Sequence, residues 1–322
     1  MPESPQAILV LPHLRIQAAN MVSSPMTWGF PAPSGFAGFT HALSRKIAKR
    51  YDLELGGVGI VCHKFEPQVS RPPGKYTNVL CLTRNPVKKD GKTASIVEEG
   101  RVHLEVTLVV GARGEALWEH DLNSLAMELY EMALAMRVAG GSILPPLTRR
   151  YKPEFVEWPE DSEGIESETR KLRRKLLPGF ALVERQDILE ERKAELASSN
   201  DKTTTLDALL DLCRMNFAPD PKTAAADEVS WKMVRRRSGW LVPIPLGFAA
   251  ISEVYQPGEV ANTRDTSTPF RFAEATLGIG EWLSPHRIQN MESLLWHYQA
   301  DTEDGLYGCR NNYTNIELGK KD

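Results

Sequence analysis

A basic segment between two predicted strands carries the densest group of chemically useful side chains in this sequence. Residues 64–92 hold seven lysines and arginines against two acidic residues, together with Tyr76 and the turn pairs Asn85-Pro86 and Asp90-Gly91. Cationic side chains on a protruding hairpin can neutralise the phosphates of a nucleic-acid backbone. The same composition also fits an ordinary solvated loop, and composition alone favours neither interpretation.

The proline- and glycine-rich loop that enters the first predicted helix is a second candidate. Ser34 is the expected N-cap, because its hydroxyl can accept hydrogen bonds from the free N–H groups of the first turn. A helix N-terminus attracts anions such as phosphate, and Trp28 or Phe30 would be available to stack on a base. The alternative is a loop held by buried aromatic side chains, which the loop residues by themselves favour.

Three histidines offer a different chemistry. His13, His63 and His103 all fall on predicted strands of one sheet, and three imidazoles on one face would suit a metal or acid–base site. The strands can equally carry them on different faces, so we favour individually hydrogen-bonded histidines.

Other catalytic patterns are absent from the sequence. It contains no phosphate-binding G-x-x-x-x-G-K-[ST] loop, no G-x-S-x-G, no H-E-x-x-H and no dinucleotide-binding glycine loop. The four cysteines are scattered without a C-x-x-C pair, which argues against structural zinc and for free thiols in a reducing compartment. We therefore expect no enzyme activity, cofactor or metal.

The composition is that of a soluble globular protein. The 322 residues are 42% hydrophobic and 25% charged, with a net charge of −3. This net charge argues against a non-specific nucleic-acid coat but leaves room for a local basic site. No stretch approaches the length of a membrane span, and the N-terminus lacks the features of a signal peptide. We expect a cytoplasmic protein without membrane contact.

The elements that must position these residues begin in the order β-α-β-β-α. The hydrophobic pattern predicts strands over 7–17 (interrupted by Pro12), 57–65 and 101–111, and helices over 35–51 and 121–138. The first helix has an apolar face of Phe36, Phe39, Leu43 and Ile47. A fourth strand over 179–185 would complete a ferredoxin-like, RRM-like α+β fold, with 142–178 as an insertion.

The second half is less regular. The pattern predicts helices over 188–197, capped by Asp187, over 206–216, and from Ser284-Pro285 to about Tyr298. Residues 239–251 read as extended, and Pro243 and Pro245 argue against a central position in a sheet. We expect a core over 1–186 and a C-terminal region over 187–322 packed on it. The basic runs Arg170–Lys175 and Arg235–Arg237 fit solvated surface, the former at a helix end.

Long stretches of the chain resemble a known family. The run NMVSSPMTWGFPAPSGFAGFTHAL (20–43) is similar to the strand-to-helix signature of the RAMP CRISPR proteins, in which a proline-rich loop feeds a helix opening with glycine and aromatic residues. The more specific resemblance is to the second Csy subunit of type I-F CRISPR surveillance (Csy, or Cascade) complexes. It extends over 57–75, 82–106, 136–145, 175–183, 204–217, 238–248 and 276–287. It does not extend to 151–169, 218–237 or the tail after Gly305.

The resemblance implies a non-catalytic RNA-binding subunit with a ferredoxin-like core. Such a subunit pairs with the large Csy subunit, holds the 5′ handle of the guide RNA (crRNA) and touches the first backbone subunit at the foot of the filament. It meets target DNA only indirectly during antiviral defence. A thumb-like hairpin inserts into the guide and displaces a nucleotide, and residues 66–100 are the expected thumb of this chain.

The candidate RNA-binding residues combine this resemblance with side-chain chemistry. Cationic side chains would bind the backbone, polar side chains would read base edges, and an aromatic ring would stack on a base. The candidates for backbone contacts are Arg71, Lys75, Arg84, Lys88 and Arg101. The candidates for base edges are Asn20, Ser24 and His103, those for helix N–H groups are Ser34 and Gly35, and Trp28 is the stacking candidate.

Two alternatives remain open on the sequence. Some RAMP relatives cleave guide precursors, and His41, beside Arg45 on the outer face of the first helix, would be the general base of such an endoribonuclease. The other alternative is a protein-only scaffold that never touches RNA.

Overall fold

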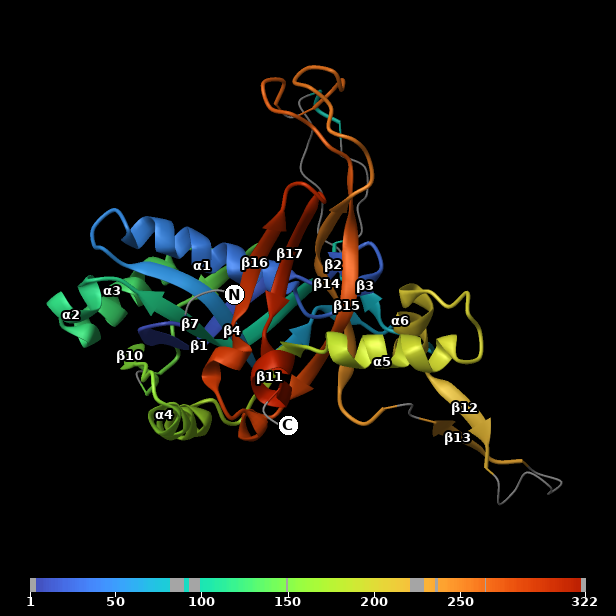
Figure 1. Ribbon diagram of the computed structural model, residues 1–322, viewed down its shortest axis with the longest axis horizontal. Helices are drawn as coiled ribbons and strands as arrows, with labels where there is room; N and C mark the ends of the chain where they lie inside the picture. Colours follow the sequence, from blue (N-terminus) through green and yellow to red (C-terminus); the bar gives the residue numbers. More distant parts are fainter. Residues whose placement is uncertain are drawn as a thin grey trace.

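The computed structural model describes residues 4–81, 90–92, 99–148, 150–220, 229–234, 237–263 and 265–319. It is a mixed α+β protein built on one large antiparallel sheet (Figure 1). The strands of this sheet are β1 (Ala7–Asn20), β4 (Glu54–Pro67), β7 (Arg101–Arg113), β8 (Arg137–Val138), β9 (Gly141–Leu144), β10 (Glu154–Glu157), β11 (Phe180–Glu184), β14 (Leu241–Ala250), β15 (Ala273–Leu283), β16 (Trp296–Asp301) and β17 (Leu306–Asn311).

The order across the sheet is β11-β15-β14-β17-β16-β4-β7-β1-β9-β8, with β10 also paired to β1. Short ribbons outside it are β2 (Val22–Ser24) with β3 (Thr27–Trp28), β5 (Val69–Ser70) with β6 (Val79–Leu80), and β12 (Asn216–Pro219) with β13 (Trp231–Val234). The helices are α1 (Pro33–Ile47), α2 (Ala116–Glu119), α3 (Leu122–Leu134), α4 (Ser162–Lys175), α5 (Gln186–Ala197) and α6 (Thr205–Cys213). None of the described helices is long and apolar enough to cross a membrane.

The first strand runs through the predicted interruption at Pro12. The register between β1 and β7 shifts between Leu11 and Leu14, and His13 has a φ of 50°. A second shift precedes Ala19, at Ala18 with a φ of 56°. Such bulges let a strand hold a proline that cannot donate to the ladder and continue beyond it.

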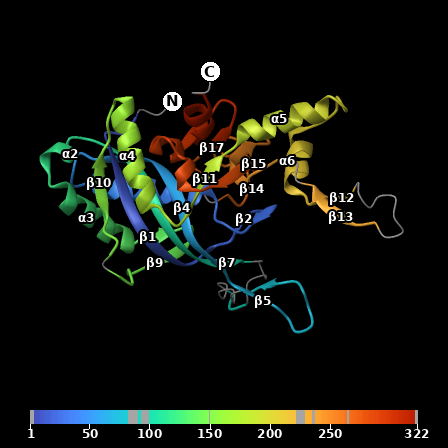
Figure 2. The ribbon, with the colours of Figure 1, turned by 90° about the horizontal axis from the view of Figure 1, so that it is seen from below.

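Helices cover both faces of the sheet. The predicted apolar face of α1 is confirmed, since Phe36, Phe39, Leu43 and Ile47 are buried in the core that α1 and α3 form with one face. The predicted N-cap is wrong. Pro33 takes the first helical position, so the cap falls on Ala32, which has no side-chain oxygen, and Ser34 lies inside the first turn. On the opposite face α4 lies against β1 and β10 (Figure 2), and Leu172 of α4 and its C-cap residue Leu176 join a second core.

The predicted fourth core strand, 179–185, forms a strand in a different place. It is β11, which pairs with β15 and with β4, on the edge of β4 away from β7. The free edge of β1 is covered instead by β9 and β10, which lie in the segment predicted as an insertion. These four-residue strands are too short to give a readable alternation.

The strand over 241–250 does take an inner position in the sheet, which corrects the prediction from its prolines. Pro243 and Pro245 lie where β14 pairs with β15 alone, and the second neighbour, β17, joins only at Gly247–Ala249. The missing proline N–H groups therefore fall on a locally open edge.

The predicted helix from Ser284 to Tyr298 is wrong. The segment forms 3₁₀ turns over Pro285–Arg287 and Met291–Leu294 and then enters β16. The buried carboxylate of Glu317 accepts hydrogen bonds from the backbone N–H groups of Gln289 and Asn290 and from the hydroxyl of Ser293. This distant carboxylate binds the N–H groups that a longer helix would have used.

The predicted helices over 188–197 and 206–216 are confirmed as α5 and α6. Thr204 or Thr205 is the cap that the sequence offers for α6, and the structure has Thr204, in a capping box with Asp207. Asp187 does not cap α5, because the cap position is Arg185 and the Asp187 carboxylate pairs with the Arg185 guanidinium at 2.8 Å. The boundary predicted at 186/187 falls after the first residue of α5, which begins at Gln186, and it stays a prediction.

Candidate nucleic-acid interface

One end of the sheet brings most of the described candidate residues together. β1 ends at Asn20, directly opposite Arg101 at the start of β7, and β4 ends at Pro67 opposite Val102. The thumb leaves the sheet at this point, where the Gln68 N–H donates to the Arg101 carbonyl at 2.8 Å. Three neighbouring strands therefore present their polar ends beside the base of the thumb.

The β2–β3 ribbon folds back over this end. The Met21 N–H donates to the Gly100 carbonyl, and the Asn20 amide bonds both the N–H and the carbonyl of Val22. The Ser24 hydroxyl lies 2.7 Å from that of Thr27. An amide and a hydroxyl each keep hydrogen-bonding capacity after such contacts, so Asn20, which is exposed, can still offer a base edge a donor or acceptor.

The described part of the thumb is a solvated hairpin with free cationic charge. β5 and β6 close its stem, and Figure 2 shows it projecting beyond the sheet. Arg71 and Lys75 are both exposed, and the Arg71 guanidinium makes a hydrogen bond of 3.3 Å to the neutral Asn78 amide. Lys64 differs, because its ammonium is paired with Glu66 at 2.8 Å. Arg84 and Lys88 lie outside the described residues.

Arg101 and His103 lie on β7 beneath the thumb. The Arg101 guanidinium pairs with Glu99 at 2.6 Å, so an RNA phosphate would compete with that carboxylate. His103 accepts a hydrogen bond at Nδ1 from the Ala18 N–H at 3.1 Å. A neutral imidazole in this arrangement carries its proton on Nε2 and can donate it to a base or phosphate.

The start of α1 is built more tightly than the sequence suggests. The Gly35 N–H already donates to the Ala32 carbonyl at 2.9 Å, and the Ser34 carbonyl accepts from the Tyr298 hydroxyl. A Cβ on Gly35 would stand 3.2 Å from that of Ala139, which explains the glycine by close packing. These two residues lie near the Asn20 end, since the Asn20 N–H donates to the Ala139 carbonyl.

Trp28 projects from β3, with 70% of its surface exposed, at the edge of an aromatic cleft. The cleft also contains Phe65, Phe180 and Trp240, which were not predicted as site residues. Aromatic residues on predicted strands are ordinarily assigned to the core. The sequence signal for them is that each of these segments carries an aromatic residue. That the segments converge here is revealed only by the pairing of β11 with β4.

Two of the three strand histidines come together, and the third does not. His13 and His63 stack with ring centroids 4.1 Å apart, and Tyr151 stacks on the other side of His13 at 3.7 Å. His13 donates from Nδ1 to the Glu105 carboxylate at 2.6 Å. Burial lowers the pKa of His63, which lies between the Pro178 carbonyl and the Thr107 hydroxyl. Each of the three rings makes a hydrogen bond, as predicted, but His13 and His63 are stacked and not separate. No group of metal-binding side chains occurs among the described residues.

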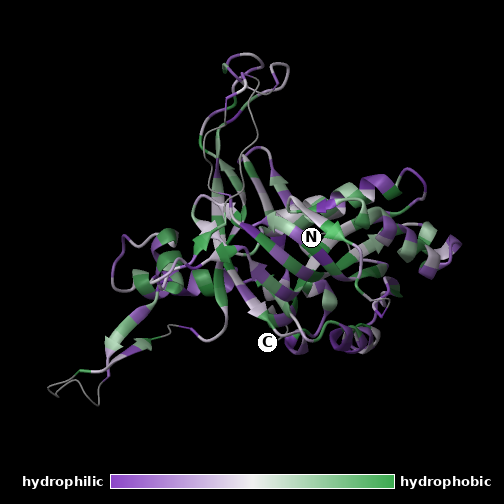
Figure 3. Cartoon of the chain, turned by 180° about the vertical axis from the view of Figure 1, so that it is seen from behind, coloured by the Kyte–Doolittle hydropathy of each residue, from purple (hydrophilic) through white to green (hydrophobic). Residues whose placement is uncertain are grey.

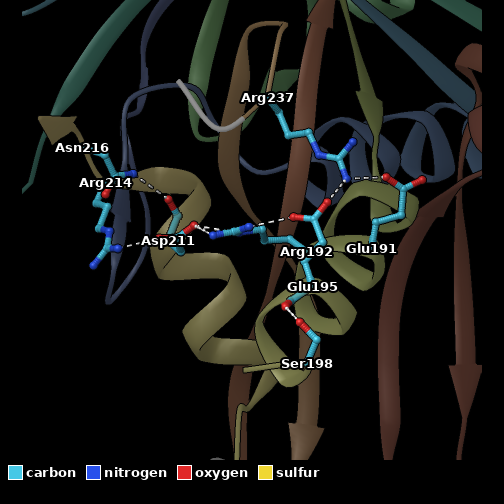
Figure 4. A network of polar contacts seen from close by, with 8 residues as sticks. All are labelled: Glu191, Arg192, Glu195, Ser198, Asp211, Arg214, Asn216 and Arg237. Atoms are coloured by element: carbon cyan, nitrogen blue, oxygen red, sulfur yellow. Dashed lines mark hydrogen bonds and ion pairs between the residues drawn. The ribbon is translucent and has the colours of Figure 1, made fainter. Parts of the chain in front are cut away.

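Some residues of the other two basic runs form ion pairs, and Arg235 and Arg236 lie outside the described residues. On α4, Arg170 pairs with Glu166 and Lys171 with Glu168, as expected for a solvated helix end. Arg237 bridges Glu191 and Glu195 of α5 at 2.6 and 2.9 Å, beside the pairing of Arg192 with Asp211 that ties α5 to α6 (Figure 4). Arg237 therefore holds the segment before β14 against α5.

Comparisons with known proteins identify similar chains. The family model described as CRISPR-associated protein (Cas_Csy2) matches residues 9–309. The chain is also 51% identical over 311 residues to the CRISPR-associated protein Csy2 of Pseudomonas aeruginosa (strain UCBPP-PA14), covering 94% of each protein. These matches confirm the resemblance inferred from the sequence motifs.

Proposed function

Because the chain belongs to the Csy2 family of CRISPR-associated proteins, we propose that it is a non-catalytic guide-RNA-binding subunit of a type I-F surveillance complex. In this role it holds the 5′ handle of the crRNA, pairs with the large Csy subunit and contacts the backbone subunit at the foot of the filament. The observation that carries the proposal is the convergence of Asn20, Ser24, Trp28, Arg101 and His103 at the base of the cationic thumb.

The strand order supports a ferredoxin-like core for this role. β9, β1, β7 and β4 are neighbours in that order, every adjacent pair is antiparallel, α1 connects β1 to β4, and α3 follows β7. This order supports a split β-α-β fold in which β9 takes the place of the fourth strand instead of β11. The proposed interface then lies at one end of the four strands.

The chemistry of the interface suits a single-stranded RNA segment. Arg71 and Lys75 neutralise phosphates, because neither is paired with a carboxylate among the described residues. Asn20 and His103 retain donors that can read base edges, which single-stranded RNA exposes and duplex RNA hides. The site therefore favours an unpaired handle over a helix.

The test is ultraviolet crosslinking with mass spectrometry on the chain co-expressed with the large subunit and a guide RNA. We expect peptides from 64–106 and 20–28 to crosslink to the 5′ handle. Crosslinks confined to the large subunit, with this chain clean, would contradict the proposal and favour the protein-only scaffold.

The endoribonuclease alternative is separated by an activity assay. His41 lies on the exposed face of α1 and lines a cleft with His297, whose pKa is lowered by burial. We expect the purified protein to leave a CRISPR repeat hairpin intact. Cleavage that disappears in His41→Ala would instead establish the catalytic alternative.

A further inference from the structure

An open cleft of about 380 Å³ lies beside the base of the thumb. It is enclosed by the β2–β3 ribbon, the end of β4, and strands β11 and β14. Its aromatic residues come from five separate segments and are Trp28, Phe30, Phe65, Phe180, Trp240 and Trp282. Phe180 and Trp240 meet edge to face with ring centroids 5.3 Å apart, and Trp240 lies 6.3 Å from Trp282.

The mouth of this cleft exposes an unusual amount of aromatic surface. The exposed fractions are 70% for Trp28, 55% for Trp240, 46% for Phe180 and 43% for Phe65. Large apolar side chains gathered around one opening mark a binding site more often than chance exposure. Four such rings lining one opening therefore mark this cleft as a candidate binding site.

The floor of the cleft is fixed by the core. Phe30 stacks on the fully buried Phe36 at 5.5 Å and meets Trp282 edge to face at 4.8 Å. The cleft is thus continuous with the packing of α1 against the sheet. A site preorganised in this way orders its ligand without first ordering its own side chains.

The charges around the cleft distinguish one class of occupant. No lysine, arginine, aspartate or glutamate lines it, and its two titratable groups stay neutral: burial raises the pKa of the Cys62 thiol to about 12 and lowers that of His63. Immediately outside, the thumb begins two residues after Phe65 and carries Arg71 and Lys75. An uncharged aromatic slot beside free cations matches a flat neutral base attached to a charged backbone.

From this juxtaposition we propose that the cleft binds one unstacked base of the guide RNA, held between Trp28 and the Phe180–Trp240 pair. The inference rests on the proposed function and adds to it a specific subsite. The base enters as the thumb separates it from its neighbours, its phosphates lie against Arg71 and Lys75, and the Ser23 hydroxyl at the rim offers a hydrogen bond to its edge.

The test couples removal of a base to removal of a ring. The pair formed by this chain and the large subunit is titrated with a set of handle RNAs, each carrying one abasic nucleotide, using wild type and Trp28→Ala. We expect one abasic position and Trp28→Ala each to weaken binding about 5- to 100-fold, as for loss of one base–aromatic stack. Combining the abasic nucleotide with Trp28→Ala should weaken binding little more than either change alone, because both remove the same stack.

Controls keep the result specific. Trp118→Ala removes a tryptophan of similar exposure, 63%, on α2, outside the cleft, and should leave every affinity unchanged. Trp28→Phe keeps a ring, so the same abasic nucleotide should again weaken its binding of the handle. Trp240→Ala should behave as Trp28→Ala does, and the abasic nucleotide should weaken its binding little further.

The outcomes also separate this inference from the proposed function. Tight binding of the intact handle with no abasic position coupled to Trp28 or Trp240 would overturn the cleft proposal alone. Failure of the wild-type pair to bind the handle would overturn both. Loss of assembly with the large subunit in the absence of RNA, in Trp28→Ala or Trp240→Ala, would show that the cleft holds a protein segment and would also overturn the proposal.

Discussion

At the scale of single residues, the hydrogen bonds of His63 determine which of its ring nitrogens carries the proton. Nδ1 lies 2.6 Å from the Pro178 carbonyl, which can only accept, so Nδ1 carries the hydrogen. Nε2 then accepts from the Thr107 hydroxyl at 2.7 Å, and the same hydroxyl oxygen accepts from the backbone N–H of His13. Every polar atom is satisfied with a neutral ring, which ties β1, β4 and β7 together on one face of the sheet.

This arrangement predicts an acid-sensitive contribution to stability. Burial lowers the pKa of folded His63 below its usual 6.5, and the nearby His13 lowers it further, while the Pro178 bond and Glu105 oppose the shift. Above pH 6.5 the ring is neutral in both states and its contribution is complete. As the pH falls below 6.5, the unfolded chain takes up a proton that the folded ring resists, so the free energy of unfolding declines until the folded pKa is reached.

The measurement is urea unfolding at pH 7.5, 6.5 and 5.5 for wild type and His63→Asn. One proton accounts for a decline of at most about 1.4 kcal/mol per pH unit. Asparagine does not titrate, so the variant should be less stable at pH 7.5 but lose less on acidification. Burial lowers the pKa of His297 as well, and that effect is common to both proteins. Equal pH slopes would show that His63 is not the titrating group.

At the scale of elements, the thumb is the segment on which the proposed RNA contacts depend most. Single-stranded nucleic acid releases counterions on binding, with a slope of log K against log salt of about −0.7 for each neutralised phosphate. We expect the double variant Arg71→Ala, Lys75→Ala to weaken binding and to flatten this slope by about 1.4. The measurement is fluorescence anisotropy of a labelled handle at several salt concentrations, with the large subunit present.

The matched control for the thumb removes the same charge elsewhere. Lys46 and Lys49 are exposed at the far end of α1, eleven or more residues, or roughly 16 Å, from Gly35. Lys46→Ala, Lys49→Ala should leave the slope unchanged. A thumb variant that binds less tightly with the wild-type slope would mean that Arg71 and Lys75 do not contact phosphates.

Elements with a strong local pattern could be predicted from the sequence. The apolar stripe of α1, the long strands β1, β4 and β7, and helices α5 and α6 are all marked by neighbouring residues alone. Elements fixed by distant partners could not. β11 was expected beside β1 but lies on the other side of β4, and a predicted helix was replaced by turns held by Glu317.

The residues of the candidate site likewise divide into those that the local sequence marks and those that only distant pairing brings together. Trp28 and the basic thumb stand out by residue type, and Asn20 and Arg101 by their places at strand ends. Phe180 and Trp240 could not be assigned to the cleft, because they are 60 residues apart and meet only once β11 has joined the sheet. Ser34 was misjudged as a cap because α1 begins two residues earlier than predicted, at Pro33, which moves the cap to Ala32.

At the scale of the whole molecule, the two halves of the chain share one sheet. β4 and β11 from the first half pair with β16 and β15 of the second half. The fully buried Trp296 of β16 donates its indole N–H to the Leu182 carbonyl of β11 at 3.0 Å. The core beneath α4 combines Val61 and Val109 with Leu283, Ile288 and Leu294 from the second half. Figure 3 shows hydrophobic residues along the strands of both halves, with the β12–β13 ribbon projecting from this common body.

This shared core predicts the behaviour of a fragment cut at the boundary inferred from the sequence. A chain ending at residue 186 keeps β11 but loses β14 to β17, so the outer edge of β4 and the apolar face that Leu294 covers become exposed. Unpaired edges and uncovered apolar surface favour aggregation. We expect residues 1–186 to be insoluble or to bind the dye ANS without a cooperative unfolding transition, measured by size-exclusion chromatography, fluorescence and circular dichroism beside the full chain. A monomeric fragment that unfolds cooperatively would show instead that the first 186 residues form a domain of their own, and that the second half is packed onto a core already complete.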